Sequence, residues 1–325
     1  MTVSDNRSDG PYYPAQSIPV ALPVAASTPP DEHRQSGRPG GVTARNTPRV
    51  PRAERPAERR SRQALARIRR SLSDRDLAVL ASVKDHRFLT TRQLEVLHFS
   101  LDATRLSAAR TSRRVLNRLA ALGLLRHLDR RVGGFSAGSA AHIWAVTETG
   151  DRLLHLGDSS RNRQRYREPS ERLLAHALAI GSRRIDLTLA ERSGQLELIE
   201  VATEPNCWRP YLGPVGERLV LQPDLAAVTA SPGSGYEDCW FIEVDLSSEH
   251  LPTVLRKCGQ YEAYRRTGRE QQERGTFPIV IWVMSSDTRA DELARRILGT
   301  PSLDPALFRV TTPERFIPVL MGRSA

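Results

Sequence analysis

The chain has 325 residues, of which 39% are hydrophobic, so it is long enough for two ordinary domains and a tail. Lysine and arginine outnumber the acidic residues by 48 to 37, which gives a formal net charge of +11 and a sequence pI of about 10.3. This positive charge favours a polyanionic partner such as nucleic acid, although a soluble basic protein without such a partner could have the same composition.

Residues 1–70 are expected to form a disordered tail. They contain ten of the 22 prolines, with Ser, Gly and Asp between them, and show no stable apolar period. Arginines are concentrated in the second half, residues 45–70. This half suits either a flexible basic arm for nucleic acid or a solvated linker.

Residues 71–160 have the pattern of a winged helix-turn-helix domain. The expected helices cover residues 73–86, 93–99 and 106–122, the expected strands cover 124–128 and 142–146, and a closing helix covers 147–156. Ser73 is the expected N-cap of the first helix, and Gly123 is expected to end the third. The phrase "VLNRLAALGLL", followed by a hairpin and "WAVTETGDRLL", resembles the winged-helix regulators.

Arginines dominate the expected DNA-contacting surface. The third helix keeps Val115, Leu116 and Leu119 for the core and leaves arginines outside, and the wing adds two more. The six expected contacts are Arg110, Arg113, Arg114, Arg118, Arg130 and Arg131. Because guanidinium groups reach phosphates and guanine edges from the major groove, we expect this region to bind double-stranded DNA. A winged helix used only for protein contact or dimerisation is the alternative.

Residues 168–325 are expected to form an α/β domain with a mixed central sheet, so the whole chain is of the α+β class. A long amphipathic helix opens at Pro169 and extends past Leu189. The expected strands cover 196–201, 218–221, 225–228, 239–244 and 277–284, and the expected later helices cover 253–266 and 287–298.

Two strand phrases in this domain resemble the core of the PD-(D/E)xK nuclease superfamily. They are "QPDLAAV" at 222–228 and "WFIEVDLSSE" at 240–249. The resemblance implies that Asp224, Glu243 and Asp245 bind Mg²⁺ or Mn²⁺, because phosphodiester hydrolysis requires charge neutralisation and a water of lowered pKa. Glu243 and Asp245 lie two apart, so a strand projects both to one face.

The sequence departs from that superfamily where Asp245 stands in place of a lysine. A lysine displaced to the following helix is a remedy seen in the superfamily, and Lys257 lies in that helix with Gln260 and Tyr261 beyond it. Lys84 and Lys257 are the only lysines among the 48 basic residues, so retention for a chemical role and a surface lysine that escaped substitution are both consistent with the sequence.

Other features are interpreted as structural or absent. His176 and Glu171 are expected to be structural helix residues, and no P-loop occurs. The three cysteines form no CxxC pair, the apolar stretch 18–26 contains two prolines, and no later run reaches the ~20 residues of a membrane span. A cytoplasmic protein that is neither secreted nor membrane-spanning is expected.

The order of the winged helix, "LLAHALAI" at 173–180 and the two acidic strands resembles the replication-relaxation family of actinobacterial plasmids and integrative elements. The resemblance covers about residues 71–300 and implies a role in plasmid replication and relaxation. Other replication proteins and a second copy of the chain stay open as further partners. Three hypotheses stay open: a metal-dependent DNA-nicking enzyme, a DNA-binding protein whose nuclease fold has lost catalysis, and a transcription regulator.

Overall fold

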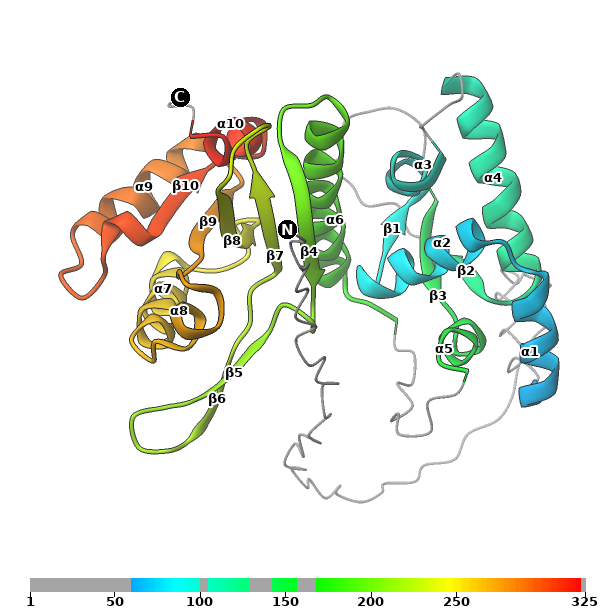
Figure 1. Ribbon diagram of the computed structural model, residues 1–325, viewed down its shortest axis with the longest axis horizontal. Helices are drawn as coiled ribbons and strands as arrows, with labels where there is room; N and C mark the ends of the chain where they lie inside the picture. The colour runs from blue at the N-terminus through cyan, green and yellow to red at the C-terminus, as the bar shows by residue number, and fades with distance from the viewer. Residues whose placement is uncertain (1–59, 100–104, 129–141, 157–167, 323–325) are drawn as a thin grey trace, which may run out of the picture. The chain divides into compact units, whose positions relative to one another are not determined.

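A computed structural model describes residues 60–99, 105–128, 142–156 and 168–322 (Figure 1). Its first half is mainly helical and contains a small antiparallel sheet of order β1-β3-β2. The elements are α1 (Arg62–Ser71), α2 (Asp74–Asp85), β1 (Leu89–Thr90), α3 (Thr91–Phe99), α4 (Arg105–Ala121), β2 (Leu125–Leu128), β3 (Ile143–Val146) and α5 (Glu148–Leu154). The helices expected after Ser73 and the strands on either side of residues 130–139 are therefore confirmed.

Local polar contacts explain where these helices begin and end. Ser73 and Asp76 form a capping box at the start of α2, in which each side chain accepts a hydrogen bond from the other's backbone N–H. Arg118 of α4 donates to the buried carboxylate of Asp76, which ties the two helices together. Gly123 follows α4 with φ of 68°, a left-handed conformation that glycine adopts without steric cost.

Helix α1 corrects the expected extent of the tail, because residues 62–71 are helical rather than disordered. Leu65 is buried in the core of the first half, and Ile68 and Leu72 pack against the same core. Arg69 also donates to the backbone carbonyl of Leu153 in α5 over 3.2 Å. The dense arginines masked an amphipathic stripe that tertiary packing makes helical. Residues 1–59 lie outside the described part.

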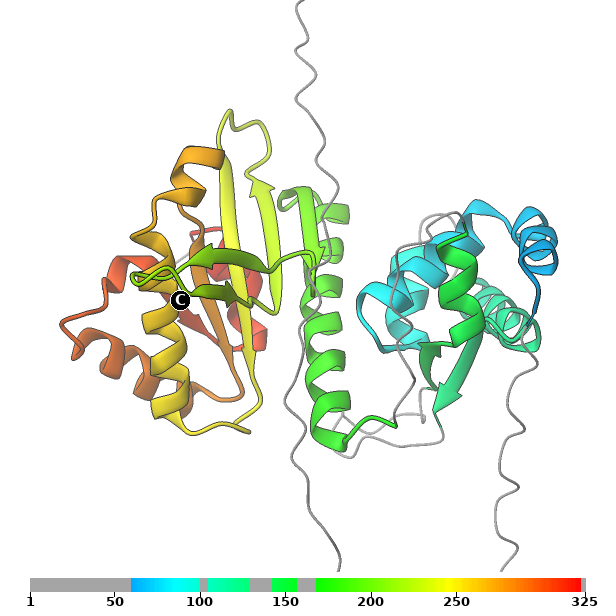
Figure 2. The ribbon, with the colours of Figure 1, turned by 90° about the horizontal axis from the view of Figure 1, so that it is seen from below.

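The second half is built on a five-stranded sheet. Its elements are α6 (Glu171–Arg192), β4 (Glu197–Thr203), β5 (Arg209–Leu212), β6 (Arg218–Leu221), β7 (Leu225–Ala230), β8 (Glu237–Asp245), α7 (Leu251–Arg265), α8 (Arg269–Arg274), β9 (Ile279–Met284), α9 (Asp287–Leu298), β10 (Phe308–Thr311) and α10 (Phe316–Leu320). Two short 3-10 helices, Pro305–Leu307 and Pro313–Arg315, flank β10. Strands β5 and β6 pair with each other as a separate hairpin that extends beyond one end of the sheet (Figures 1 and 2).

The strand order β10-β9-β8-β7-β4 makes the sheet mixed, as expected. Strand β9 runs parallel to both β8 and β10, whereas β7 runs antiparallel to both β8 and β4. The parallel pairs are joined by α7 and α8 on one crossover and by α9 on the next, which is how parallel neighbours must be connected. The chain therefore combines helices with a mixed central sheet.

Each face of this sheet has its own core. On one face, α7 and α9 pack against alternate strand residues such as Phe241 and Trp282. On the other face, α6 and α10 pack against the intervening residues, among them Ile242 and Ile281. The strict alternation follows from the period of two in a strand. Odd-numbered residues of β8 therefore face α7 and α9.

Helix α6 contacts elements of both halves of the described chain. It lies beside β4 (Figure 2), and its residues Leu174 and Leu178 share a core cluster with Phe88 and Ile143. The buried side chain of Gln93 in α3 donates to the carbonyl oxygen of Leu178 over 2.9 Å. Among the described residues, no helix is long and apolar enough to cross a membrane.

Candidate functional site

Strand pairing brings two of the expected acidic residues together. Leu225 of β7 pairs with Ile242 of β8, and continuing this antiparallel register by one residue sets Asp224 opposite Glu243. Directly opposed residues project to the same face of a sheet. Both carboxylates are buried, with 6% of Asp224 and 1% of Glu243 exposed. Two carboxylates thus meet where β7 begins.

Helix α7 supplies the partners of Glu243. Lys257 donates to Glu243 Oε2 over 2.6 Å, and the hydroxyl of Tyr261 donates to Glu243 Oε1 over 2.5 Å. Lys257 and Tyr261 are four residues apart, so one face of a helix presents both. The structure therefore brings together Asp224, Glu243, Lys257 and Tyr261, four residues that the sequence singled out.

Asp245 lies on the same strand face but has a different partner. Arg289 of α9 donates from Nε to Asp245 Oδ1 over 3.1 Å and from Nη2 to Oδ2 over 2.8 Å. The backbone N–H of Ser247 also donates to Oδ1 over 2.5 Å. A bidentate guanidinium is a strong and oriented partner for a carboxylate. Both oxygens of Asp245 are thus engaged outside the Asp224–Glu243 pair.

His176 of α6 has an acidic partner that the sequence did not identify. Its Nε2 lies 3.3 Å from Asp224 Oδ1, and the backbone N–H of Val244 donates to the other oxygen of Asp224 over 2.8 Å. The hydrogen bond to Asp224 raises the pKa of His176, against the effect of burial. The sequence identified no acidic partner for this histidine, and the structure places Asp224 there. Residues 176 and 224 belong to elements far apart in sequence, so no local pattern linked them.

The two facing carboxyls differ in acidity. Burial raises the pKa of Glu243 to about 8, and the charge of Asp224 adds to this against the opposing effects of Lys257 and Tyr261. Burial also raises the pKa of Asp224, but the hydrogen bond from His176 and the charge of Lys257 outweigh it, so the net shift is downward. Burial lowers the pKa of Lys257, yet the charges of Glu243 and Asp224 raise it overall. One cavity thus holds a carboxyl that retains a proton near neutrality, a carboxylate and an ammonium group.

These groups line a cavity of about 320 Å³, which we call the acidic cavity. It is lined by Ser170, Arg172, Leu173, His176, Asp224, Glu243, Val244, Asp245, Ser248, Glu249, Lys257 and Trp282. Gln260 is exposed on α7, and Glu171 is exposed in the first turn of α6; neither lines the acidic cavity. The expected helix pair Gln260 and Tyr261 is therefore divided, because only Tyr261 points to Glu243.

Glu204 is a further acid near this site, and the sequence did not single it out. Thr203 of β4 pairs with Leu225, so the register continued by one residue sets Glu204 beside Asp224. Its carboxylate forms an ion pair of 2.9 Å with Arg87, the residue between α2 and β1. Burial raises the pKa of Glu204, while Arg87 opposes the shift. Nothing in the surrounding sequence indicates that Glu204 lies beside Asp224, since this position depends on pairing between distant strands.

The acidic cavity offers few oxygen ligands to a divalent cation. Within the described residues, no three His, Cys, Asp or Glu side chains are placed to hold a metal ion together. Asp224 and Glu243 alone provide two hard oxygen donors in one cavity, and Mg²⁺ commonly uses one or two carboxylates and keeps several waters. The pair fits Mg²⁺ or Mn²⁺ in chemistry, whereas Asp245 is held by Arg289.

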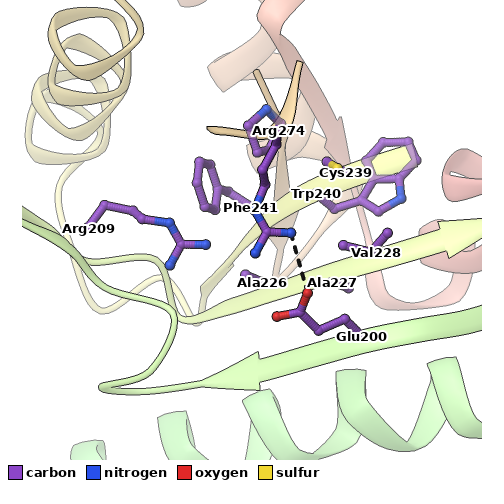
Figure 3. Close-up of a pocket in the computed structure, with 10 residues that line it drawn as sticks. Glu200, Arg209, Ala226, Ala227, Val228, Cys239, Trp240, Phe241 and Arg274 are labelled. Carbon is purple, nitrogen blue, oxygen red and sulfur yellow. Dashed lines mark hydrogen bonds and ion pairs between the residues drawn. The ribbon is translucent and has the colours of Figure 1, made fainter. Parts of the chain in front are cut away.

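A second hollow on the domain is too small for a ligand. It measures about 10 Å³, which is at most the space of one water molecule, and it contains Glu200, Arg209 and Arg274 (Figure 3). Arg274 forms an ion pair with Glu200 over 3.3 Å, shown by the dashed line, and Arg209 lies 5.4 Å from the ring centroid of Phe241. These contacts close the surface around Phe241.

The arginines expected to contact DNA lie on one helix where the structure describes them. Arg110, Arg113 and Arg114 of α4 are exposed, and Arg118 is exposed but bonded to Asp76. Their neighbours Leu116 and Leu119 are fully buried, as the expected apolar stripe requires. The other two expected contacts, at positions 130 and 131, lie outside the described residues.

Comparison with known protein families identifies a match over much of the chain. A family model described as replication-relaxation matches residues 80–280, which is more than half of the chain. The matched region includes the arginines of α4 and the four residues that meet at Glu243, and it ends before Arg289. No curated protein and no solved structure matches the chain.

Proposed function

Because the chain belongs to the replication-relaxation family, we propose that it binds double-stranded DNA in plasmid or mobile-element replication or relaxation and nicks it at the acidic cavity. Family membership supports the role in replication or relaxation. The observation that carries the cleavage proposal is the approach of Lys257 to Glu243, 2.6 Å apart, beside the second carboxylate of Asp224. Because Asp245 replaces the in-line lysine of the nuclease pattern, an active enzyme needs a lysine from another element, and Lys257 of α7 would supply it.

DNA binding is assigned to α4 as the recognition helix of a winged helix-turn-helix. The order α2, α3, α4, β2, β3 supports this assignment, as do the three exposed arginines Arg110, Arg113 and Arg114 of α4. Residues 102–131 contain eight arginines and two acids. An excess of guanidinium groups on one helix favours phosphate contacts over a purely protein-binding role.

The charged groups around Asp224 and Glu243 have separate parts in the proposed reaction. Asp224 and Glu243 would hold Mg²⁺ or Mn²⁺, which when bound neutralises phosphate charge and lowers the pKa of a water. The ammonium group of Lys257 adds positive charge where the phosphate would lie. Tyr261 fixes the orientation of Glu243, and His176 that of Asp224. Arg289 keeps Asp245 in place.

A plasmid-nicking assay tests the proposal. The purified full chain is incubated with supercoiled plasmid with and without Mn²⁺, beside Glu243→Gln and the control Glu237→Gln, which changes an exposed acid on the same strand. We expect Mn²⁺-dependent open circles from the wild type and Glu237→Gln, and their loss in Glu243→Gln. Equal nicking by Glu243→Gln would contradict the assignment of this site.

A second candidate is a DNA-binding platform whose nuclease-like site no longer cleaves. The observation that favours it is Asp245 at the position of the in-line lysine, where the bidentate contact with Arg289 engages both carboxylate oxygens that could otherwise bind a metal ion. Wild-type protein that binds plasmid but does not nick it in any of the assays would support this candidate.

A further inference from the structure

A second large cavity lies away from the acidic cavity and is bounded by α2, α3 and α6. It measures about 420 Å³, and we call it the basic cavity. It is lined by Ser82, His86, Leu97, His98, Arg184, Thr188, Glu191 and Arg192. The lining therefore contains two arginines, two histidines and two hydroxyl groups but one acidic residue. This space falls within the range of small-molecule sites.

The two arginines of the basic cavity have no carboxylate partner at ion-pair distance among the described residues. Arg192 donates to the carbonyl oxygens of Val96 over 2.5 Å and Leu97 over 3.2 Å, and so satisfies the last turn of α3. Arg184 donates to the hydroxyl of Thr188 over 3.0 Å. A guanidinium has five N–H donors, so each retains donors for a ligand. A partly buried charge without a counterion is costly, and a bound anion would offset that cost.

One of the two histidines adds a buried ring nitrogen that no described residue bonds. His98 Nε2 lies 3.0 Å from the hydroxyl of Ser82, and His86 Nδ1 lies 2.9 Å from the backbone carbonyl oxygen of Ser82. The other ring nitrogen of His86, Nε2, is buried without a hydrogen-bond partner among the described residues. Since its first nitrogen is next to a carbonyl acceptor, a neutral ring carries its proton there. A protonated His86 would also donate from Nε2.

Burial and the surrounding charges lower the pKa of both histidines. Burial lowers the pKa of His98 to about 4, and the charges of Arg192, Arg184 and Arg75 add to this. Burial also lowers the pKa of His86, with Arg184 acting in the same direction and Asp85 against it. Burial lowers the pKa of Arg184, and the charge of Glu191, the acid of the cavity lining, opposes this shift. An anion in the cavity would reverse the field and favour protonation of both rings.

We propose that the basic cavity binds a phosphate group, carried by a nucleotide or by the DNA backbone. The donors of Arg184, Arg192, His86 and the Ser82 hydroxyl outnumber the oxygens of a carboxylate, whereas a phosphate presents three or more strong acceptor oxygens. The site is separate from the acidic cavity, so it does not depend on cleavage there. Glu191 weakens the attraction and sets a limit on affinity.

Binding experiments with the full chain test this site and distinguish the two sources of phosphate. Inorganic phosphate, deoxyadenosine monophosphate and a short DNA duplex are titrated separately by calorimetry into wild type, Arg184→Gln and Glu191→Gln. For the source that binds, Arg184→Gln should raise the dissociation constant about tenfold or more, because a charged hydrogen bond is lost. Glu191→Gln should lower the constant for the same ligand. Arg295→Gln, an exposed arginine on α9, serves as the control.

Histidine resonances provide a readout specific to the site. On addition of the ligand, the pKa of His98 should rise from about 4, and this rise should be smaller in Arg184→Gln. Thermal unfolding verifies that both variants fold, and their opposite effects cannot both arise from a general loss of structure. No binding of any of the three probes, or binding that neither variant changes, would overturn the proposal.

Discussion

At the scale of single residues, Glu243 is the group on which the acidic cavity depends. Its carboxyl is 1% exposed and accepts one hydrogen bond at each oxygen, from Lys257 and from Tyr261. Burial of a carboxylate is costly unless partners compensate, and here the compensation is incomplete because the pKa is still raised to about 8. The protonation of this carboxyl therefore changes around pH 8.

This raised pKa predicts how stability depends on pH. Between pH 4.5 and about 8 the folded protein holds a proton on Glu243 that the unfolded chain releases, so the stabilisation is present below pH 4.5 and is lost as pH rises to 8. Glu243→Gln remains neutral and lacks this loss. We expect the free energy of unfolding of Glu243→Gln, relative to that of the wild type, to be about 1–3 kcal/mol higher at pH 8 than at pH 5, since one pKa unit corresponds to ~1.4 kcal/mol.

Urea unfolding at pH 5, 6.5 and 8 measures this difference. Glu237→Gln is the control, because it removes an exposed acid from the same strand and should follow the wild-type pH profile. Parallel profiles for wild type and Glu243→Gln would contradict the raised pKa of Glu243.

The sequence predicted the members of the acidic cavity unevenly, for a physical reason. Asp224 and Glu243 could be identified from the sequence because each lies in a local strand pattern, and Lys257 could be identified because lysine is rare in a chain rich in arginine. The roles of His176 and Arg289 could not be identified, because each reaches its partner only after helices α6 and α9 pack on opposite faces of the sheet. Side-chain pairing over such separations leaves no periodic signal.

At the scale of elements, α6 depends on a close approach at Gly181. A Cβ atom at this position would lie 2.9 Å from Leu89 Cδ2 and 3.1 Å from Gln93 Nε2. Gln93 cannot easily move away, because it also donates to the carbonyl of Leu178 and accepts from the backbone N–H of Thr90 over 2.9 Å. The absence of a side chain therefore lets α3 pack against the middle of α6.

A pair of glycine substitutions tests this packing. Gly181→Ala should lower stability by about 1 kcal/mol, because overpacking of ~1–3 kcal/mol exceeds the gain in helix propensity. Gly259→Ala in α7 should raise stability by about 0.5–1 kcal/mol, since no atom lies within 4 Å of its Cβ position. Denaturant unfolding of both variants provides the measurement. Stabilisation by both substitutions would show that α6 does not require the glycine.

Several elements were missed in the sequence because packing, not pattern, forms them. Strand β5 has only four residues, includes Pro210 and pairs with β6 alone, so it has no alternating apolar signal. Strand β10 lies at the edge of the sheet and also has four residues. By contrast, α4 and α9 were predicted within two residues of their observed ends, because caps or glycines mark them.

At the scale of the whole molecule, sequence patterns predicted the mixed sheet but not its order. The apolar strands and the helices between them were sufficient to indicate a sheet with helices packed on it. The order β10-β9-β8-β7-β4 depends on which distant segments pair, and that choice is made by the two cores together. The facing of Asp224 and Glu243 follows from this order, which is why the site could be expected only in part.

The net charge of the whole chain leads to the last prediction, which separates a local DNA contact from general attraction. Arg113→Ala with Arg114→Ala removes two exposed charges from α4, and Arg295→Ala with Arg296→Ala removes two from α9. Because each phosphate contact contributes about one unit to the slope of log affinity against log salt, the α4 pair should reduce this slope by up to about 2.

Titration of a random-sequence duplex at several salt concentrations measures this slope for both double variants. The α9 pair should leave it nearly unchanged, although both pairs lower the net charge of +11 equally. An equal reduction in both would mean that overall charge, rather than the arginines of α4, attracts the DNA. An unchanged slope in the α4 pair would remove α4 from the interface altogether.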